Sequence, residues 1–233
     1  MKDIDDKSID LILCDLPYGT TACKWDTIIP FEPLWEHYKR IIKDNGAIVL
    51  TASQPFTSAL VMSNVKMFKY EWVWIKDAGT GFLNAKKYPL KNTENILVFC
   101  KGVHKYNPQM REGKPYTITR GRKSDNYGKD TKDIIITTNK GERYPLTSLN
   151  FKRDSNKLHP TQKPVALFEY LIKTYTNEGD LVLDNCAGSG TTGVACINLN
   201  RNFILIEKEQ EYIDIINQRL SSLDKSLTTK QQP

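Results

Sequence analysis

Residues 15–18 read Asp-Leu-Pro-Tyr and place a carboxylate, a backbone carbonyl and an aromatic ring in one short loop. An exocyclic amine of adenine or cytosine is a poor nucleophile, because its lone pair is delocalised into the ring. Two acceptors at fixed positions, the carboxylate of Asp15 and the carbonyl of Leu16, would activate it. Pro17 stiffens the loop, and Tyr18 offers a stacking surface to a base flipped out of a duplex. Because Asp-x-Pro turns are also common as purely structural features, this tetrapeptide needs a second signal.

That signal is a glycine loop late in the chain. The apolar segment 181–184 leads into Gly-Ser-Gly-Thr-Thr-Gly at residues 188–193, a G-x-G-x-x-G pattern, and Glu207 ends the next apolar segment. Glycines let the backbone approach a ligand closely, and the following helix presents free N–H groups. Glu207 would accept hydrogen bonds from ribose hydroxyls. A nicotinamide site or a tight structural turn would show the same pattern, but neither explains the loop at Asp15.

The basic residues are concentrated in one segment. Residues 101–158 hold fourteen Lys and Arg against six Asp and Glu, a local excess of eight, whereas the whole chain has a formal charge of +6, so the remainder sums to −2. Aromatic side chains are interleaved with these cations, which suits phosphate contacts and stacking on bases, although a solvated basic loop would look similar. The predicted DNA contacts are Lys24, Arg111, Arg120, Arg122 and Lys123. Lys24 and Trp25 follow shortly after the Asp15 loop, and the alternative is that they cover the cleft next to that loop.

Composition excludes several classes of protein. No apolar run approaches the roughly 20 residues of a membrane span, and the first ten residues lack the apolar core of a signal peptide, so we expect a cytoplasmic protein. The five cysteines are odd in number and widely spaced, with no C-x-x-C pair. This argues against a disulfide framework and against a zinc site. We expect free thiols and no metal.

Strand and helix patterns alternate along the chain. Apolar runs at 9–14, 47–51, 181–184 and 203–207 predict buried strands, and segments 70–76 and 95–101 predict two more that could pair as a hairpin. Helical spacing is found at 33–44, where Asn45-Gly46 ends the helix, at 57–65, from Pro164 to 175, briefly after 190, and at 211–220. Residues 101–158 lack periodicity apart from 133–138. The pattern predicts an α/β fold with a mainly parallel sheet covered on both faces.

Three segments in this order resemble the β group of amino-DNA methyltransferases: DLPYGTTACKWD from Asp15, HPTQKP from His159 to Pro164, and LDNCAGSGTT from Leu183. The match spans nearly the whole chain, and Leu16 in place of the first proline of D-P-P-Y is similar to phage-type members. The resemblance implies a Rossmann-like fold, S-adenosylmethionine as cofactor and double-stranded DNA as partner. The residues it assigns to the cofactor are Asp184, Ala187, Gly188, Gly190, Thr191, Glu207, Thr161 and Lys163. Thr161 and Lys163 are expected near the methionine carboxylate, and Glu207 near the ribose.

The resemblance also implies a division of the chain: a catalytic half at 1–100, a target-recognition insertion at 101–158, a cofactor-binding half at 159–220, and a flexible tail at 221–233. Because the motif begins with Asp rather than Ser, adenine N6 is the expected target and cytosine N4 the alternative. Relatives carry a further strand and acidic turn that line the adenine of the cofactor, and this sequence opens without them. A DNA-binding remnant without cofactor is therefore a second alternative. A homodimer and a cognate restriction enzyme are possible partners.

Overall fold

The computed structural model describes residues 1–21, 23, 26–120, 135–155 and 162–229, without the side chains of 120, 135 and 224–229. The chain forms two compact units, one made of Met1–Asn107 with Thr147–Pro233 and the other of Pro108–Leu146. No helix in the described part of the chain is long and apolar enough to cross a membrane.

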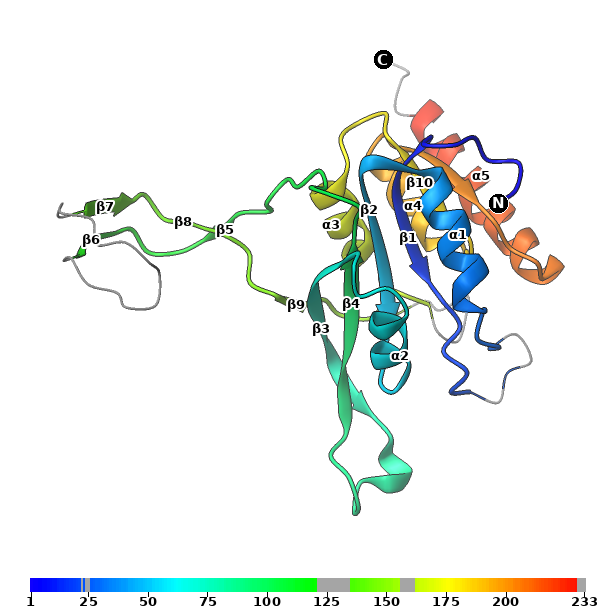
Figure 1. The fold of residues 1–233 in the computed structure, drawn as a ribbon, viewed down its shortest axis with the longest axis horizontal. Coiled ribbons are helices and arrows are strands. Elements are labelled where there is room, and N and C mark those ends of the chain that lie inside the picture. Colours follow the sequence, from blue (N-terminus) through cyan, green and yellow to red (C-terminus); the bar gives the residue numbers. More distant parts are fainter. Residues whose placement is uncertain (22, 24–25, 121–134, 156–161, 230–233) are drawn as a thin grey trace. The chain divides into compact units, whose positions relative to one another are not determined.

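The larger unit is built on a seven-stranded sheet with the order β11-β10-β1-β2-β4-β3-β9 (Figure 1). Strands β11, β10, β1 and β2 are parallel to one another, β4 is antiparallel to both β2 and β3, and β9 is parallel to β3. The bounds are β1 Ile9–Asp15, β2 Ile42–Ala52, β3 Phe68–Thr80, β4 Lys91–Phe99, β9 Ser148–Asn150, β10 Leu181–Asp184 and β11 Asn202–Leu205. The prediction of a mainly parallel α/β sheet is confirmed.

The sheet brings two carboxylates to one edge. Strands β1 and β10 are parallel neighbours, with Leu11 beside Val182 and Ile12 beside Leu183. Both strands therefore end at the same edge, β1 in Asp15 and β10 in Asp184. In open α/β sheets this is the edge at which ligands bind.

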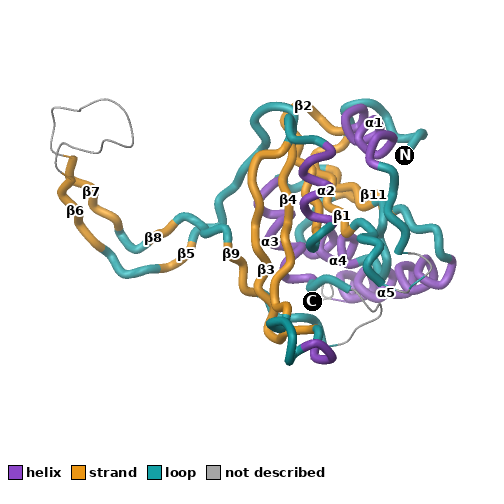
Figure 2. Tube along the Cα trace, turned by 60° about the horizontal axis from the view of Figure 1, so that its bottom comes forward, coloured by secondary structure: helices purple, strands orange, loops and turns teal. Residues whose placement is uncertain are grey.

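Helices cover both faces of the sheet (Figure 2). Alternate residues of a strand point to opposite faces, so Ile12 joins a core with helices α1 and α2, whereas Leu11 and Leu13 join a second core with α3 and α4. The helices are α1 Phe31–Ile41, α2 Phe56–Ser63, α3 Val165–Tyr175, α4 Thr191–Asn198 and α5 Gln210–Thr229.

Several boundaries differ from those expected, among them the following three. Helix α1 ends at Ile41 instead of Asp44, because Ile42 is buried and already pairs with Ile9 in the sheet. Glu207 lies two residues beyond β11 instead of ending that strand. Helix α5 continues to Thr229, so the expected tail from residue 221 is helical over most of its length.

The predicted hairpin is confirmed and is longer than expected. Strands β3 and β4 pair antiparallel from Phe68 opposite Phe99 to Thr80 opposite Lys91. A short 3-10 turn, η1 Phe82–Asn84, lies at its tip.

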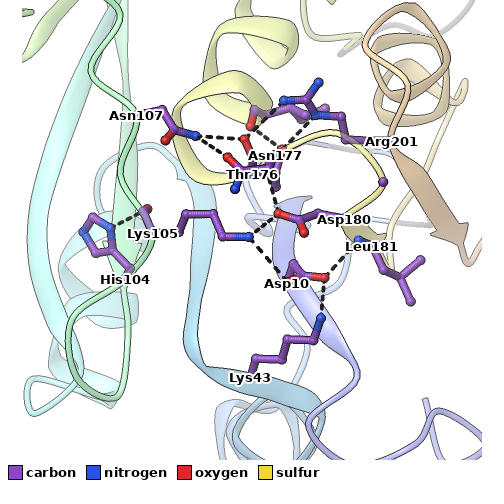
Figure 3. Close-up of polar contacts among 12 residues, drawn as sticks. Asp10, Lys43, His104, Lys105, Asn107, Thr176, Asn177, Asp180, Leu181 and Arg201 are labelled. Atoms are coloured by element: carbon purple, nitrogen blue, oxygen red, sulfur yellow. Dashed lines mark hydrogen bonds and ion pairs between the residues drawn. The ribbon is translucent and has the colours of Figure 1, made fainter.

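A polar network at the opposite end of β1 and β10 fixes the chain just before the smaller unit (Figure 3). Asp10 accepts hydrogen bonds from Lys43 at 2.7 Å and from the backbone N–H of Leu181 at 3.1 Å. Lys105 lies 3.8 Å from Asp10 and also pairs with Asp180. These contacts hold residue 105 against the sheet.

Asn107 is tied to the same region, because its side-chain amide donates to the carbonyl of Thr176 at 2.9 Å. The compact smaller unit therefore starts at Pro108 and ends at Leu146, within the expected 101–158 insertion. Residues 147–150 return to the larger unit, where β9 extends the sheet beside β3.

The smaller unit consists of two antiparallel ribbons. Strand β5 Arg111–Glu112 pairs with β8 Glu142–Arg143, and β6 Tyr116–Arg120 pairs with β7 Ile135–Asn139. The guanidinium carbon of Arg143 lies 4.4 Å from the centre of the Tyr116 ring. The segment 133–138, excepted above from the lack of periodicity, corresponds in its described part to β7.

Candidate active site

The two motifs at the sheet edge line one cavity of about 700 Å³. Asp15, Leu16, Pro17 and Tyr18 lie on its wall together with residues 184–189. The arrangement follows from β1 and β10 being parallel neighbours. A cavity of this size is typical of a site for a small-molecule cofactor together with a substrate group.

The carboxylate of Asp15 is fixed by three side chains. Oδ1 accepts hydrogen bonds from the hydroxyl of Tyr18 at 2.8 Å and from the hydroxyl of Thr51. Oδ2 accepts one from the ammonium group of Lys163 at 2.5 Å. A carboxylate oxygen has about two acceptor sites. Among the described residues, Oδ1 therefore accepts as many hydrogen bonds as it can, whereas Oδ2 accepts one and can accept another.

Lys163 is the cation of a buried charge cluster. Its side chain is only 5% exposed, and Nζ also lies 3.5 Å from Oε2 of Glu94. Glu94 in turn pairs with Lys76. Burial alone would lower the pKa of Lys163, but the charges of Asp15 and Glu94 raise it above its ordinary value. Lys163 therefore stays protonated and neutralises the two carboxylates.

Thr51, Lys76 and Glu94 were not among the predicted site residues. Thr51 is paired in register with Asp15 across β1 and β2. A threonine inside the apolar run 47–51 was a usable signal, because a buried hydroxyl needs a partner. Glu94 had no such signal, since its place depends on β4 running antiparallel to β2.

Tyr18 is held in place on its ring and on its hydroxyl. The ring stacks on Phe56 with a centroid distance of 5.2 Å, and the hydroxyl also lies 2.9 Å from Oγ1 of Thr51. Burial and the nearby charge of Asp15 raise the pKa of Tyr18 well above its ordinary value. The side chain is therefore a neutral hydroxyl that donates to the carboxylate.

A second carboxylate shapes the loop that follows Tyr18. Asp26 accepts hydrogen bonds from the backbone N–H groups of Gly19, Thr20 and Thr21 at 2.8, 2.9 and 2.7 Å. Burial alone would raise the pKa of Asp26, but the hydrogen bonds from Thr21 and from these N–H groups lower it below its ordinary value. Asp26 is thus ionised, and it fixes the conformation of residues 19–21 at the wall of the cavity.

Asp184 organises the glycine loop from the end of β10. Its Oδ1 accepts from the backbone N–H of Cys186 at 3.0 Å, and its Oδ2 from the hydroxyl of Thr192 at 2.5 Å. Burial raises the pKa of Asp184 to about 6, although these hydrogen bonds oppose the shift. Gly188 and Gly190 have φ angles of +51° and +79°, which favour glycine.

Glu207, two residues beyond β11, is hydrogen-bonded to the glycine loop. Its Oε2 accepts from the backbone N–H of Gly188 at 2.8 Å, and its Oε1 from the N–H groups of Lys208 and Glu209 at 2.8 and 3.0 Å. Oε2 therefore retains an acceptor site, as Oδ2 of Asp15 does. Ala187 is held by a bond from its N–H to the carbonyl of Ile206 at 3.1 Å.

The two halves of the cavity are joined next to Lys163. The hydroxyl of Thr191 lies 3.4 Å from the carbonyl of Lys163, and the hydroxyl of Ser189 lies 3.1 Å from Oε1 of Gln162. Nη1 of Arg219 donates to the carbonyl of Ser189 at 3.0 Å. The segment before α3 is thereby bonded to the glycine loop.

Some of the predicted contacts fall outside the described residues or in the smaller unit. Lys24, Arg122, Lys123 and Thr161 are outside the described residues. Arg111 belongs to the smaller unit, where its guanidinium donates to the carbonyl of Tyr144 at 3.2 Å. Arg120 ends β6. Within the described ranges, no group of three or more His, Cys, Asp or Glu side chains is arranged to hold a metal ion.

Comparison with known proteins identifies the class to which this geometry belongs. Residues 9–218 match the N6/N4 methyltransferase family, whose description is DNA methylase, and the chain belongs to that family. The predicted membership of the amino-DNA methyltransferases is thus confirmed. S-Adenosylmethionine is the methyl donor of this class.

Individual relatives agree with this assignment. The chain is 29% identical over 235 residues to the type II methyltransferase M.HpaI of Haemophilus parainfluenzae, covering 95% of this chain and 71% of that protein. It is 30% identical over 240 residues to the DNA adenine methyltransferase YhdJ of Escherichia coli, covering 94% and 79%. The crystal structure of an M1.HpyAVI–SAM complex is similar with a TM-score of 0.62 and 29% identity, covering 91% of this chain and 90% of that one.

Proposed function

We propose that this DNA methyltransferase transfers a methyl group to N6 of an adenine that has been rotated out of double-stranded DNA. The observation that carries the proposal is that Oδ2 of Asp15 accepts a single hydrogen bond from the described part of the chain, in the cavity that Asp15 shares with the Gly188 loop. One carboxylate oxygen is anchored by Tyr18 and Thr51, so the other has a fixed direction.

The proposed reaction uses Asp15 and Leu16 together. One N–H of the amine donates to Oδ2 of Asp15 and the other to the carbonyl of Leu16, which draws the nitrogen toward a tetrahedral geometry and exposes its lone pair. Tyr18 contacts the plane of the base, with its own ring supported by Phe56. The nitrogen would form a bond to the methyl carbon while the bond from that carbon to the sulfonium sulfur breaks, its electron pair staying on the sulfur as a neutral thioether, and the proton that the nitrogen loses would pass to Asp15. Pro17 limits the freedom of the loop during this step.

The residues at the other wall of the cavity fit the cofactor. S-Adenosylmethionine supplies a methyl group that its sulfonium has already activated. We propose that Asp184, Ala187, Gly188, Gly190 and Thr191 hold its methionine end, together with Thr161. Glu207 would accept a ribose hydroxyl through the remaining site on Oε2. Alignment of the amine with the methyl group then supplies much of the rate acceleration.

Lys163 receives a different role from the one that the resemblance implies. Its ammonium group is bonded to Asp15 and lies near Glu94, so we propose that it orients and neutralises Asp15 instead of binding the methionine carboxylate. Lys163 is then a positioning residue for the acceptor oxygen.

The choice of adenine rests on two observations. The acceptor motif begins with Asp15, and the similar protein YhdJ is named a DNA adenine methyltransferase. N4 of cytosine is the alternative, because its amine has the same two N–H groups and would meet the same acceptors. The proposed phosphate contacts are Lys24, Arg111, Arg120, Arg122 and Lys123, and the proposed target-recognition region is the 101–158 insertion.

The test is to incubate purified protein with tritium-labelled S-adenosylmethionine and bacterial DNA, digest the DNA and separate the nucleosides. We expect label in N6-methyladenine. Label in N4-methylcytosine alone would refute the choice of base. Calorimetric titration with S-adenosylmethionine separates an enzyme from a cofactor-deficient DNA-binding protein, since the latter would give no heat with the cofactor while still binding DNA. Methylation-sensitive sequencing of DNA from expressing cells then identifies the recognised sequence.

A further inference from the structure

The tip of the β3–β4 hairpin carries large apolar side chains that face solvent. Leu83 is fully exposed, and Phe82 and Tyr88 are 68% and 67% exposed. Further back on the same hairpin, Trp72 and Trp74 are buried in the core of the larger unit. The exposed side chains are therefore confined to the tip and have no part in the core.

Local hydrogen bonds give the tip a defined shape. The backbone N–H groups of Asn84 and Ala85 donate to the carbonyls of Gly81 and Phe82 at 2.9 and 3.1 Å, and that of Tyr88 donates to Asn84 at 2.9 Å. At the base of the tip, a Cβ on Gly79 would meet Cβ of Leu90 at 2.7 Å, so only glycine allows this approach of the two strands. The apolar side chains thus project from a preformed turn.

The charge around these side chains has one sign. Between Asp77 and Glu94 the sequence has three lysines, Lys86, Lys87 and Lys91, and no acidic residue. Lys86 and Lys87 are exposed beside the apolar side chains. Two such tips would repel each other, so a second copy of the chain is disfavoured as a partner for the tip. A polyanion with flat apolar groups is the complementary surface.

The tip begins where the active-site cavity ends. Thr80 and Lys91, the last pair of the hairpin ladder, both line the cavity that holds Asp15. A partner bound at the tip therefore lies next to this cavity.

We propose that the 81–90 tip binds double-stranded DNA beside the target base, with Phe82, Leu83 and Tyr88 packing against the base stack opened by extrusion of that base. Lys86 and Lys87 would contact the flanking phosphates. Apolar side chains inserted between bases are a general way to stabilise an opened duplex. The inference rests on the proposed function, because a base that stays in the duplex leaves no gap to fill.

The first experiment measures DNA binding by fluorescence anisotropy on a short duplex that contains the recognised sequence, once methylation-sensitive sequencing has identified it, so that the target base can be extruded. The variants are Phe82→Ala/Leu83→Ala/Tyr88→Ala at the tip and Met62→Ala/Val65→Ala as a matched control, since Met62 and Val65 are also exposed apolar side chains. We expect the tip variant to bind DNA about ten-fold more weakly and the control to match the wild type. Lys86→Gln/Lys87→Gln should reduce the slope of log affinity against log salt by up to about 2, in contrast to Lys66→Gln/Lys69→Gln. Unchanged affinity in the tip variants would overturn the proposal.

The second experiment distinguishes a role of the tip in base extrusion from DNA binding that has no part in extrusion. Methyl transfer is measured on a duplex with a paired target and on one with an abasic site opposite the target, where extrusion requires less energy. We expect the apolar variant to lose about ten-fold in kcat/KM on the paired duplex and to recover on the abasic one, with unchanged S-adenosylmethionine affinity. An equal loss on both duplexes would overturn the packing in the opened stack.

Two further outcomes are distinguishable. If the wild type transfers no methyl group to any DNA, the proposed function fails, and with it the packing of the tip in an opened stack. The salt dependence of Lys86→Gln/Lys87→Gln on a random-sequence duplex then still decides whether the tip contacts DNA. If sedimentation shows that the apolar variant loses self-association while its DNA affinity is unchanged, the tip is a contact between copies of the chain and the proposal is wrong.

Discussion

Nζ of Lys163 lies 2.5 Å from Oδ2 of Asp15, although 148 positions separate the two residues in the chain. The pair connects the end of β1 with the segment that precedes α3. The glycine loop is bonded to the same segment, through the hydroxyl of Thr191 and the carbonyl of Lys163. Folding of the two halves against each other therefore creates the acceptor that the proposed reaction requires.

Asp15→Ala should abolish methyl transfer while largely preserving the binding of S-adenosylmethionine. The substitution removes the acceptor of the amine, but the glycine loop and Glu207 keep their own hydrogen bonds. Single-turnover transfer and calorimetric titration measure the two effects. Asp44→Ala is the control, because Asp44 is an exposed carboxylate paired with Lys7. An active Asp15→Ala enzyme would show that the catalytic assignment is wrong.

Glu94→Gln should lower the pKa of Lys163. Two carboxylates raise that pKa, so the stability that the charged lysine contributes is present below its ordinary pKa of 10.5 and is lost as the pH rises through the raised value. With one carboxylate removed, the loss should start at a lower pH. This shift is measured from the decline of kcat and of the free energy of unfolding as the pH is raised into the alkaline range.

Glu71→Gln is the matched control for Glu94→Gln, since Glu71 is an exposed glutamate on β3. Glu94→Asp should restore part of the alkaline stability. Identical pH profiles in Glu94→Gln and the wild type would mean that Glu94 has only a packing role.

Asp26→Asn should destabilise the protein by about 2 kcal/mol at neutral pH, because three backbone N–H groups lose a charged acceptor. The folded pKa is lowered, so this stability is present above the ordinary value of 3.8 and disappears as the pH falls through the lowered one. Urea unfolding across this range measures the difference, with Asp3→Asn as an exposed control. A difference that stayed constant down to acid pH would contradict the role of the charge.

The sequence was enough to predict that the Asp15 loop and the Gly188 loop lie at the same edge of the sheet. It was not enough to predict the buried charge cluster around Lys163. Asp15 and Asp184 both end apolar runs, and parallel neighbouring strands end at one edge. Glu94 reaches the same edge because β4 runs antiparallel to β2, so that the start of β4 lies beside the end of β2. Neither strand direction nor strand order follows from the apolar pattern of residues 95–101.

The partner of Lys163 shows a second limit. A buried lysine requires an anion, and the expectation from the sequence is the methionine carboxylate of the cofactor. The packing of the segment before α3 against β1 brings Lys163 to Asp15, and that contact does not follow from the sequence pattern. The hydrogen bonds from residues 19–21 to Asp26 depend in the same way on a loop conformation that short-range sequence patterns do not specify.

Affinity for S-adenosylmethionine should rise with pH through about 6. Burial raises the pKa of Asp184 to about 6, so the side chain is neutral below that pH and negative above it, where it attracts the positively charged methionine end of the cofactor. The dissociation constant should therefore increase by up to ten-fold for each pH unit below about 6 and level off above 7. In Asp184→Asn, binding should be weak at every pH and show no inflection there, while Asp180→Asn, at the opposite end of β10, should keep the wild-type profile. Calorimetric titration between pH 5 and 8 tests this, and an inflection that persists in Asp184→Asn would assign the titrating group to another residue.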